Sequence, residues 1–426
     1  MKNDAWSWRP LGELFEIGAG KTMSAAARAG VAKTPFLRTS NVLWDEIDLT
    51  TVDEMTIPEH ELPDKLVRPG DLLVCEGGEI GRAAIWNGEM TVMSFQNHLH
   101  RLRPLVDDVE PRFYVYFLQS AFTQLGLFAG AGNKTTIPNL SRNRLAALEV
   151  PHPPQTEQKA IATALARVRS AMQTHDRSMA AAQELKRSAM LELFTQGLLG
   201  EPQKETEIGL IPEGWESVEL GKVCTLSTGT TPATKHKHYY DGNIPFIKTA
   251  DVVNNRITSA NTFISQQAID DYSLKLFPPG TVLMAMYGQG KTRGQVSLLE
   301  IAAATTQNAA AIQPSNEMDS AYLWHYLLSC YERLRGMGSL GHVSHLNLGY
   351  LRDLLIVKPP LEEQRDIARF LDTIDRKIDL HKQKRDVMGE LFMALLQRLM
   401  TGEINSEELD LSALESVGAT IEESQV

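Results

Sequence analysis

The chain has 426 residues, of which 43% are apolar and 22% charged, and its formal net charge is −11. This composition predicts a globular protein of roughly two to four domains, and the acidic balance argues against a basic protein that coats nucleic acid. No apolar run approaches the roughly 18 residues of a membrane span, no signal segment begins the chain, and the three cysteines lack metal-site spacing. We therefore expect a cytoplasmic protein with reduced thiols, no metal site and no membrane partner.

The sequence repeats itself once, at an offset of about 206 to 211 residues. The matched segments are SWRPLGELFEIGAGKT from Ser7 and GWESVELGKVCTLSTGTT from Gly214, TPFLRTSNV from Thr34 and IPFIKTADV from Ile244, RPGDLLVCEGG from Arg68 and PPGTVLMAMYG from Pro278, Gln96-Asn97 and Gln307-Asn308, and LEVPHPPQTEQKAIATAL from Leu148 and LIVKPPLEEQRDIARFL from Leu355. Since the five matches keep their order, the chain is a tandem duplication of a globular domain followed by a helix.

The globular part of each copy is predicted to be mixed α/β. In the first copy DLLVCE, RAAIW and TVMSF are short apolar runs typical of strands, and residues 112–125 form an aromatic helix. In the second copy TVLMAM and GQVSLLE are the corresponding strands, and residues 321–334 are the corresponding helix.

Each globular part is followed by a long segment with helical periodicity. Residues 157–196 contain no proline or glycine, and their apolar positions advance in alternating steps of four and three, the spacing of a heptad. The predicted seam comprises Ile161, Leu165, Val168, Met172, Ile367, Leu371, Ile374, Ile378, Phe392 and Leu395. A single helix cannot bury such a stripe, so we expect the two helices to pack together, parallel or antiparallel. His175 and His381 share one seam position, where they are polar register residues or, alternatively, a pH switch or metal pair.

The predicted fold class is α/β (α+β), with two similar domains separated by two long helices in a pseudo-twofold coiled coil. The expected boundaries are 1–150 and 207–357 for the globular domains, 151–206 and 358–402 for the helical spacers, and 403–426 for a disordered tail. This tail carries seven acidic and no basic residues, so the rest of the chain has a net charge of only −4.

Each helix begins with a PPxxEQ element, at Pro153 and again at Pro359. The prolines end the preceding strand, and the acidic residue lies in the first helical turn, where the helix dipole favours it. This duplicated element, closing an α/β unit and opening a long helix, resembles the specificity (S) subunit of type I restriction–modification systems. The resemblance covers residues 5–402.

The resemblance implies a non-catalytic subunit with no cofactor of its own. Each globular part would be a target recognition domain that reads one half of a bipartite, asymmetric site in double-stranded DNA. The helices would set the gap between the halves and dock two methylation subunits, which carry S-adenosylmethionine and modify adenine. A translocating restriction subunit would join for cleavage.

Candidate DNA contacts are the basic residues of loops rich in glycine, serine and threonine, since Lys and Arg neutralise phosphates and some Arg side chains read guanine. They are Lys21, Arg28, Lys33, Arg38, Arg82 and Lys134 in the first domain, and Lys235, His236, Lys237, His238, Lys248, Lys291 and Arg293 in the second.

Other functions have weaker support. AMYGQGKT, from Ala285, resembles a phosphate-binding loop, but the segment after it is β-branched and broken by glycine, so no helix is expected there. An adenine-gripping NPPY-type tetrapeptide and a serine elbow are both missing from the sequence. The alternative of a different class is a protein-binding scaffold, in which two α/β modules on a coiled-coil bar grip proteins. Steeply salt-dependent DNA affinity would distinguish a DNA reader from this scaffold.

Overall fold

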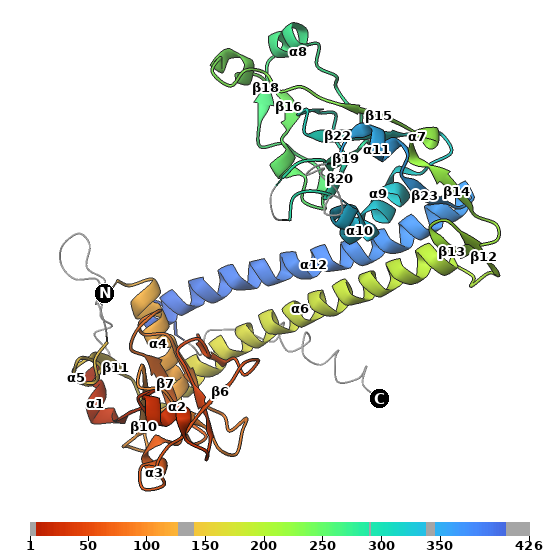
Figure 1. The fold of residues 1–426 in the computed structure, drawn as a ribbon. Coiled ribbons are helices and arrows are strands. Elements are labelled where there is room, and N and C mark those ends of the chain that lie inside the picture. Colours follow the sequence, from red (N-terminus) through yellow and green to blue (C-terminus); the bar gives the residue numbers. More distant parts are fainter. Residues whose placement is uncertain (1–5, 127–139, 289–290, 338–345, 406–426) are drawn as a thin grey trace. The chain divides into compact units, whose positions relative to one another are not determined.

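The computed structural model describes residues 6–126, 140–288, 291–337 and 346–405 (Figure 1). The chain divides into two compact units, of which the first joins residues 1–176 to 382–426 and the second is residues 177–381. Each unit contains one globular domain and part of both long helices. The segments 151–206 and 358–402, predicted as separate spacers, are thus shared between the units.

The first globular domain is built from short strands and helices. Its helices are α1 (Leu11–Leu14), α2 (Ala25–Ala29), α3 (Leu62–Lys65), α4 (Pro111–Thr123) and α5 (Arg142–Ala146), and its strands are β1 (Ser7–Pro10), β2 (Phe15–Ala19), β3 (Thr34–Leu37), β4 (Val42–Leu43), β5 (Glu46–Ile47), β6 (Asp53–Met55), β7 (Leu72–Cys75), β8 (Ala83–Ile85), β9 (Ser94–Phe95), β10 (Leu99–Pro104) and β11 (Glu149–His152). The strands form sheets in the orders β2-β10-β7-β8, β6-β3-β9, β1-β11 and β4-β5.

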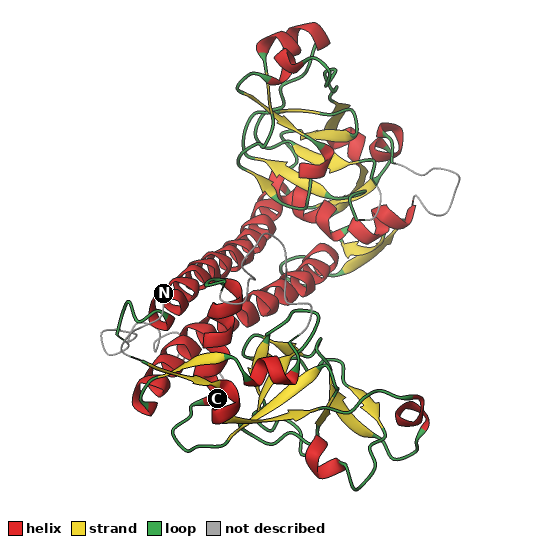
Figure 2. Ribbon diagram, turned by 90° about the vertical axis from the view of Figure 1, so that its left-hand side faces the viewer, coloured by secondary structure: helices red, strands yellow, loops and turns green. Residues whose placement is uncertain are grey.

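The second globular domain repeats this plan. Its helices are α7 (Leu220–Val223), η1 (Lys237–Tyr240), η2 (Thr249–Asp251), α8 (Gln266–Tyr272), α9 (Ser320–Ser329), α10 (Tyr331–Met337) and α11 (Leu348–Arg352), and its strands are β12 (Gln203–Thr206), β13 (Gly209–Pro212), β14 (Glu216–Glu219), β15 (Cys224–Thr228), β16 (Ile244–Ile247), β17 (Arg256–Ile257), β18 (Phe263–Ile264), β19 (Val282–Ala285), β20 (Val296–Leu299), β21 (Ala304–Thr305), β22 (Ala309–Pro314) and β23 (Leu355–Lys358). The orders β15-β22-β19-β20, β18-β16-β21 and β14-β23 match those of the first domain, while β17 adds a fifth strand beside β20 and β12-β13 is an added hairpin. Figure 2 shows the strands of both domains in yellow.

The shared sheet orders confirm the predicted duplication at the level of topology. In both domains the second strand of the three-stranded sheet pairs antiparallel with one neighbour and parallel with the other: β3 with β6 and β9, and β16 with β18 and β21. The predicted strands DLLVCE and TVLMAM are β7 and β19, whose residues are all buried. TVMSF is a strand only at its last two residues.

Aromatic residues on one helix fill the core of the first domain. Helix α4 begins with Pro111 at its first turn, and Phe113 and Tyr114 are completely buried. Phe113 meets Trp6 edge to face at 6.0 Å, and Tyr114 meets Phe15 in the same way at 5.1 Å. The helix predicted over 112–125 is therefore confirmed, and it fastens β1 and β2 to the core.

The predicted helix over 321–334 is broken. Helix α9 ends at Ser329, where the amide of Cys330 bonds to the carbonyls of both Tyr326 and Leu327, and α10 then begins at Tyr331. Such a shared hydrogen bond tightens the last helical turn. No glycine or proline marks this break, so periodicity alone misses it.

Both predicted long helices are present, as α6 (Gln155–Gln196) and α12 (Leu361–Met400). At 1.5 Å per residue each is about 60 Å long. None of the helices in the described ranges combines the length and apolarity needed to cross a bilayer.

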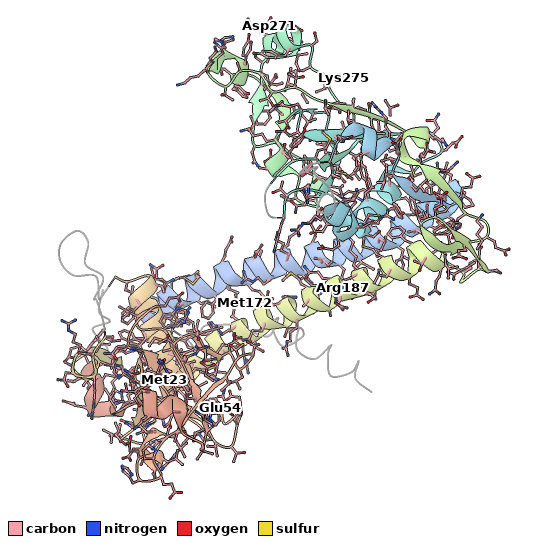
Figure 3. All side chains as sticks on the ribbon, in the orientation of Figure 1. Met23, Glu54, Met172, Arg187, Asp271 and Lys275 are labelled. Atoms are coloured by element: carbon pink, nitrogen blue, oxygen red, sulfur yellow. The ribbon has the colours of Figure 1, made fainter. Side chains whose placement is uncertain are left out.

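In the first unit the two helices pack antiparallel. Ile161, Leu165 and Val168 of α6 share one buried cluster with the α12 residues Phe392 and Leu395. Asp176 is the last α6 residue of this unit, and its carboxylate lies 3.5 Å from the guanidinium of Arg385 of α12. Met172, labelled in Figure 3, and Met388 border the same cluster. His175 is buried in this unit.

In the second unit the other halves of the helices also pack antiparallel. Phe194 of α6 shares a buried cluster with Ile367 and Leu371 of α12. The Lys186 ammonium is bonded to the Asp375 carboxylate at 2.6 Å. Further along, the backbone N–H of Leu198 donates to Glu363 at 3.3 Å. Ile374 is buried and Ile378 is half-buried.

The glutamate of each PPxxEQ element binds a tryptophan that directly precedes a strand, β1 in the first domain and β14 in the second. The indole N–H of Trp6 donates to Glu157 at 3.2 Å, and that of Trp215 donates to Glu363 at 2.9 Å. Both tryptophans are buried. The sequence predicted that this acid interacts with the helix dipole. The structure shows in addition a hydrogen bond from an indole, which helical periodicity does not predict.

The glutamine of each element closes the loop before the aromatic helix. Gln158, fully buried, donates to the carbonyls of Asp108 and Pro153 and accepts from the backbone N–H of Glu110. Gln364 makes the same three bonds, to the carbonyls of Glu317 and Pro359 and from the N–H of Asp319. The conserved geometry in both copies makes this amide the joint between each globular domain and its helix.

Candidate DNA interface

Three loops of the second domain enclose a cleft of about 740 Å³. The loops follow β15, β16 and β21, and the cleft is lined by Thr231, Thr234, Lys237, Tyr240, Phe246, Lys248, Thr249, Ala250, Thr306 and Asn308. Two ammonium groups, several hydroxyls and a carboxamide thus surround an aromatic floor. This set of groups suits a phosphodiester and a base edge.

Short hydrogen bonds hold the three loops against one another. The Thr231 hydroxyl donates to Gln307 at 2.6 Å, and the hydroxyls of Thr249 and Thr306 lie 3.0 Å apart. A Cβ at Gly229 would overlap the carbonyl of Thr305, so the loop after β15 approaches the loop after β21 through a glycine. These contacts between the loops therefore fix the shape of the cleft at the ends of the strands.

The predicted cations Lys235, Lys237 and Lys248 are exposed around this cleft, and Lys237 and Lys248 line it. Among the residues that the structure describes, these three lysines have no carboxylate within salt-bridge distance. The carboxylate of Asp251 accepts from the backbone N–H of Lys248 at 2.9 Å and so caps the turn η2. The ammonium groups remain available to an anion.

His236 and His238 lie beside these lysines. Their rings are 5.6 Å apart, and the His238 ring is 4.2 Å from that of Tyr239. The Tyr239 hydroxyl donates to Asp271 of α8 at 2.9 Å, in the region labelled in Figure 3. The histidines thus belong to an exposed aromatic group that is fixed to α8.

The remaining predicted contacts of the second domain differ from each other. Arg293 donates to the carbonyl of Arg335 at 2.9 Å and is half-buried, so it supports α10. Lys291 is exposed and its carbonyl accepts from Tyr331. The segment from Ala285 leads into strand β20, which confirms the expectation that no helix follows the phosphate-loop-like sequence.

In the first domain, three of the predicted cations are paired with carboxylates. Lys21 lies 2.6 Å from Glu61, Arg38 lies 2.9 Å from Asp53, and Arg82 lies 2.7 Å from Glu79. The side chain of Arg82 is only 13% exposed and also donates to the Thr39 carbonyl, so it is a loop support. Arg28 and Lys33 are exposed, and the Lys33 ammonium donates to the Arg28 carbonyl. Lys134 lies outside the described residues.

The structure corrects the match between the two Gln-Asn dipeptides by one residue. The amide of Glu76 bonds to the carbonyl of His98, and the amide of Met286 bonds in the same way to Asn308. His98 therefore corresponds to Asn308, and Asn97 to Gln307. The dipeptides do not occupy the same positions in the two domains.

Hydroxyl-bearing residues are the part of the cleft that was not predicted. Thr231, Thr234, Thr249 and Thr306 line it, whereas the residues predicted from the sequence were lysines, arginines and histidines. The signal was present in the threonine-rich stretch STGTTPAT around Gly229.

A charged group joins the second domain to α12. His325 is fully buried, and its Nε2 lies 2.8 Å from Asp372, which also pairs with Arg256 of β17. His325, Asp372 and Asp375 have the spacing of a metal site, but Arg256 and Lys186 already bind the two carboxylates. The group is thus an ion-pair network that attaches the domain to the helix.

Comparison with known proteins gives the same assignment over most of the chain. The family model of the type I restriction modification DNA specificity domain matches residues 3–180 and again 212–388. A specificity subunit assigned to the type I restriction enzyme MjaX of Methanocaldococcus jannaschii is 24% identical over 408 residues, which are 94% of this chain and 93% of that one. The MjaIX specificity subunit of the same organism is 22% identical over 422 residues, 95% of this chain and 94% of that one.

Solved structures share the fold. The type I restriction-modification S subunit from M. genitalium aligns with a TM-score of 0.60 at 15% identity, over 94% of this chain and 97% of that chain. A chain from a study of complex assembly and conformational transition of the type I R-M system aligns with a TM-score of 0.58 at 20% identity, over 95% of this chain and all of that one.

Two recognition-type domains, each joined to a long helix, define a DNA specificity subunit. The chain belongs to the family of the type I restriction modification DNA specificity domain, which it contains twice. Its function is the recognition of DNA sequence within a type I restriction–modification system.

Proposed function

We propose that this chain reads a bipartite, asymmetric DNA site, one half with each globular domain, and catalyses no reaction itself. The observation that carries the proposal is one duplicated topology with different side chains in the equivalent loops. The cleft of the second domain presents Lys237 and Lys248, whereas the matching face of the first presents paired Lys21 and Arg38. Two such surfaces favour different base sequences.

The thiols support a non-catalytic role. Cys75, Cys224 and Cys330 are buried and unpaired by disulfides. Burial raises the pKa of Cys75 to about 11 and that of Cys224 to about 12, so neither forms the thiolate that nucleophilic catalysis needs at neutral pH.

We further propose that the long helices dock two methylation subunits, which carry the S-adenosylmethionine, and that restriction subunits join that assembly. Apolar side chains remain exposed on α12: Phe370 and Leu380 in the second unit, and Val387 and Leu391 in the first. A helix that exposes several large apolar side chains favours binding to a protein partner. Phe370→Ser with Leu380→Ser should weaken co-purification of a methylation subunit, whereas Gln383→Ser on the same helix should not.

The decisive experiment is to sequence methylated adenines in host DNA with and without this chain. The proposal predicts a gapped, asymmetric methylated motif that disappears when the chain is deleted. A protein-binding scaffold predicts an unchanged methylation pattern. It also predicts little binding to DNA at any salt concentration, whereas a reader with several phosphate contacts loses affinity steeply as salt rises.

A further inference from the structure

The duplication places one cation at the same point of both domains. Arg38 follows β3 and Lys248 follows β16, each two residues beyond a buried phenylalanine. The backbone N–H of each bonds to the side chain three residues on: that of Arg38 to Asn41 and that of Lys248 to Asp251, both at 2.9 Å. The two positions can therefore be compared within one molecule.

Their neighbours on the adjacent strand differ in charge. Asp53 of β6 lies opposite Phe36 in the first domain, and its carboxylate pairs with Arg38 at 2.9 Å. In the second domain the carbonyl of Thr262 accepts from the N–H of Phe246, so Thr262 takes the place of Asp53. A threonine hydroxyl cannot neutralise an ammonium group.

A second cation of the first domain is neutralised in the same manner. The Lys21 ammonium contacts both oxygens of Glu61, at 2.6 and 2.8 Å, and is 20% exposed. Phosphate must compete with these carboxylates for Lys21 and Arg38, and it is repelled by them. In the cleft of the second domain, none of the described carboxylates pairs with Lys237 or Lys248, so phosphate has no such competitor there.

We infer that the two recognition domains share the work of DNA binding unequally. The second domain supplies most of the sequence-independent, salt-sensitive affinity for the phosphate backbone, through its cleft and the unpaired lysines. The first domain adds its contacts after Lys21 and Arg38 exchange a carboxylate for a phosphate. The inference rests on the proposed function, and the ligand is the backbone of double-stranded DNA.

The test is a reciprocal exchange of the neighbouring residue in the full-length chain. Thr262→Asp gives Lys248 the carboxylate that Arg38 has, and Asp53→Thr releases Arg38. Asp53 is exposed and Thr262 is half-buried, so both side chains reach solvent and the fold should tolerate the changes. Fluorescence anisotropy with a labelled duplex of unrelated sequence, over a salt series, gives the slope of log K against log salt.

Each lost phosphate contact lowers the steepness of that slope by about 0.9. We expect Thr262→Asp to lower it by about one such step and Asp53→Thr to raise it by up to the same amount. The double variant Lys237→Ala with Lys248→Ala should lower it by about two steps, and Lys21→Ala with Arg38→Ala in the first domain by clearly less, because both of those cations are paired with carboxylates. Lys222→Ala, an exposed lysine of α7 at the other end of β15 that pairs with Glu219 at 3.3 Å, controls for the loss of a positive charge far from the cleft and should leave the slope unchanged.

Different results would contradict the unequal division of DNA binding and the proposed function itself. If the unaltered chain binds DNA but the first-domain and second-domain double variants lose equal steepness, or the exchange moves neither slope, the unequal division is wrong and the proposed function stands. If the unaltered chain shows no salt-dependent binding to any duplex, the proposed function itself fails.

Discussion

Replacing Gln364 by leucine tests the joint between the second domain and α12. Leucine is similar in size and fills the buried site, but it removes the two hydrogen bonds donated to Glu317 and Pro359 and the one accepted from Asp319. At about 1 kcal/mol for each bond the loss is about 3 kcal/mol, and the orphaned N–H at the start of α9 raises it toward about 5 kcal/mol. That is a large fraction of the stability of a typical domain.

The assay is hydrogen exchange, followed at the amide of Asp319, together with urea unfolding of the whole chain. Gln364→Leu should accelerate exchange at this amide and lower the unfolding midpoint, and Gln158→Leu should do the same at Glu110 in the first unit. Gln383→Leu, at an exposed position of α12, is the matched control. If Gln364→Leu exchanges and unfolds like Gln383→Leu, the glutamine is not the joint.

Three further changes probe the attachment of the second domain. Trp215→Phe keeps an aromatic ring in the core but loses the bond to Glu363 and leaves part of a completely buried site empty, so calorimetry should show a loss of more than about 1 kcal/mol, and no loss would contradict the anchoring role. Burial lowers the pKa of His325, so its imidazole binds a proton more readily in the unfolded chain than in the folded one. The contribution of His325 to the free energy of unfolding is therefore complete above about pH 6.5 and is lost as the pH falls toward the folded pKa. His325→Gln should therefore flatten the decline of melting temperature between about pH 7 and about pH 5, and an unchanged decline would refute this origin. Leu371→Ala should cost about 2–5 kcal/mol in denaturant unfolding because the side chain is completely buried, while an effect as small as that of Leu380→Ala would show that α12 does not pack there.

Local patterns in the sequence predicted the duplication and the long helices. Pro153 and Pro359 end strands, and the alternating spacing from Ile161 and from Ile367 marks one face of a helix, so neighbouring residues contain this information. The burial of the helix residues then follows from the apolar character of that face.

Contacts between distant segments could not be predicted in this way. Whether Arg38 is paired depends on which residue of β6 lies opposite β3, and a one-residue change in register would alter it. The same limit explains the shifted Gln-Asn match and the unrecognised role of Gln158, since its partners Asp108 and Glu110 lie about 50 residues away along the chain. Selecting basic residues by loop composition therefore combined exposed lysines such as Lys237 with a structural arginine such as Arg82.

The anchoring contacts suggest how one domain can replace the other. Trp6 and Trp215 bond to equivalent glutamates, and Gln158 and Gln364 hold equivalent loops. A copy of residues 6–152 inserted in place of residues 215–358 would carry the same anchors to the start of α12.

The most direct measurement of two different readers in one chain is the adenine methylation motif produced by this chimera with its methylation subunit. Our account predicts a symmetric motif in which the half read by the first domain occurs twice. Persistence of the original asymmetric motif would show that the globular domains do not choose the two halves, and would contradict the account.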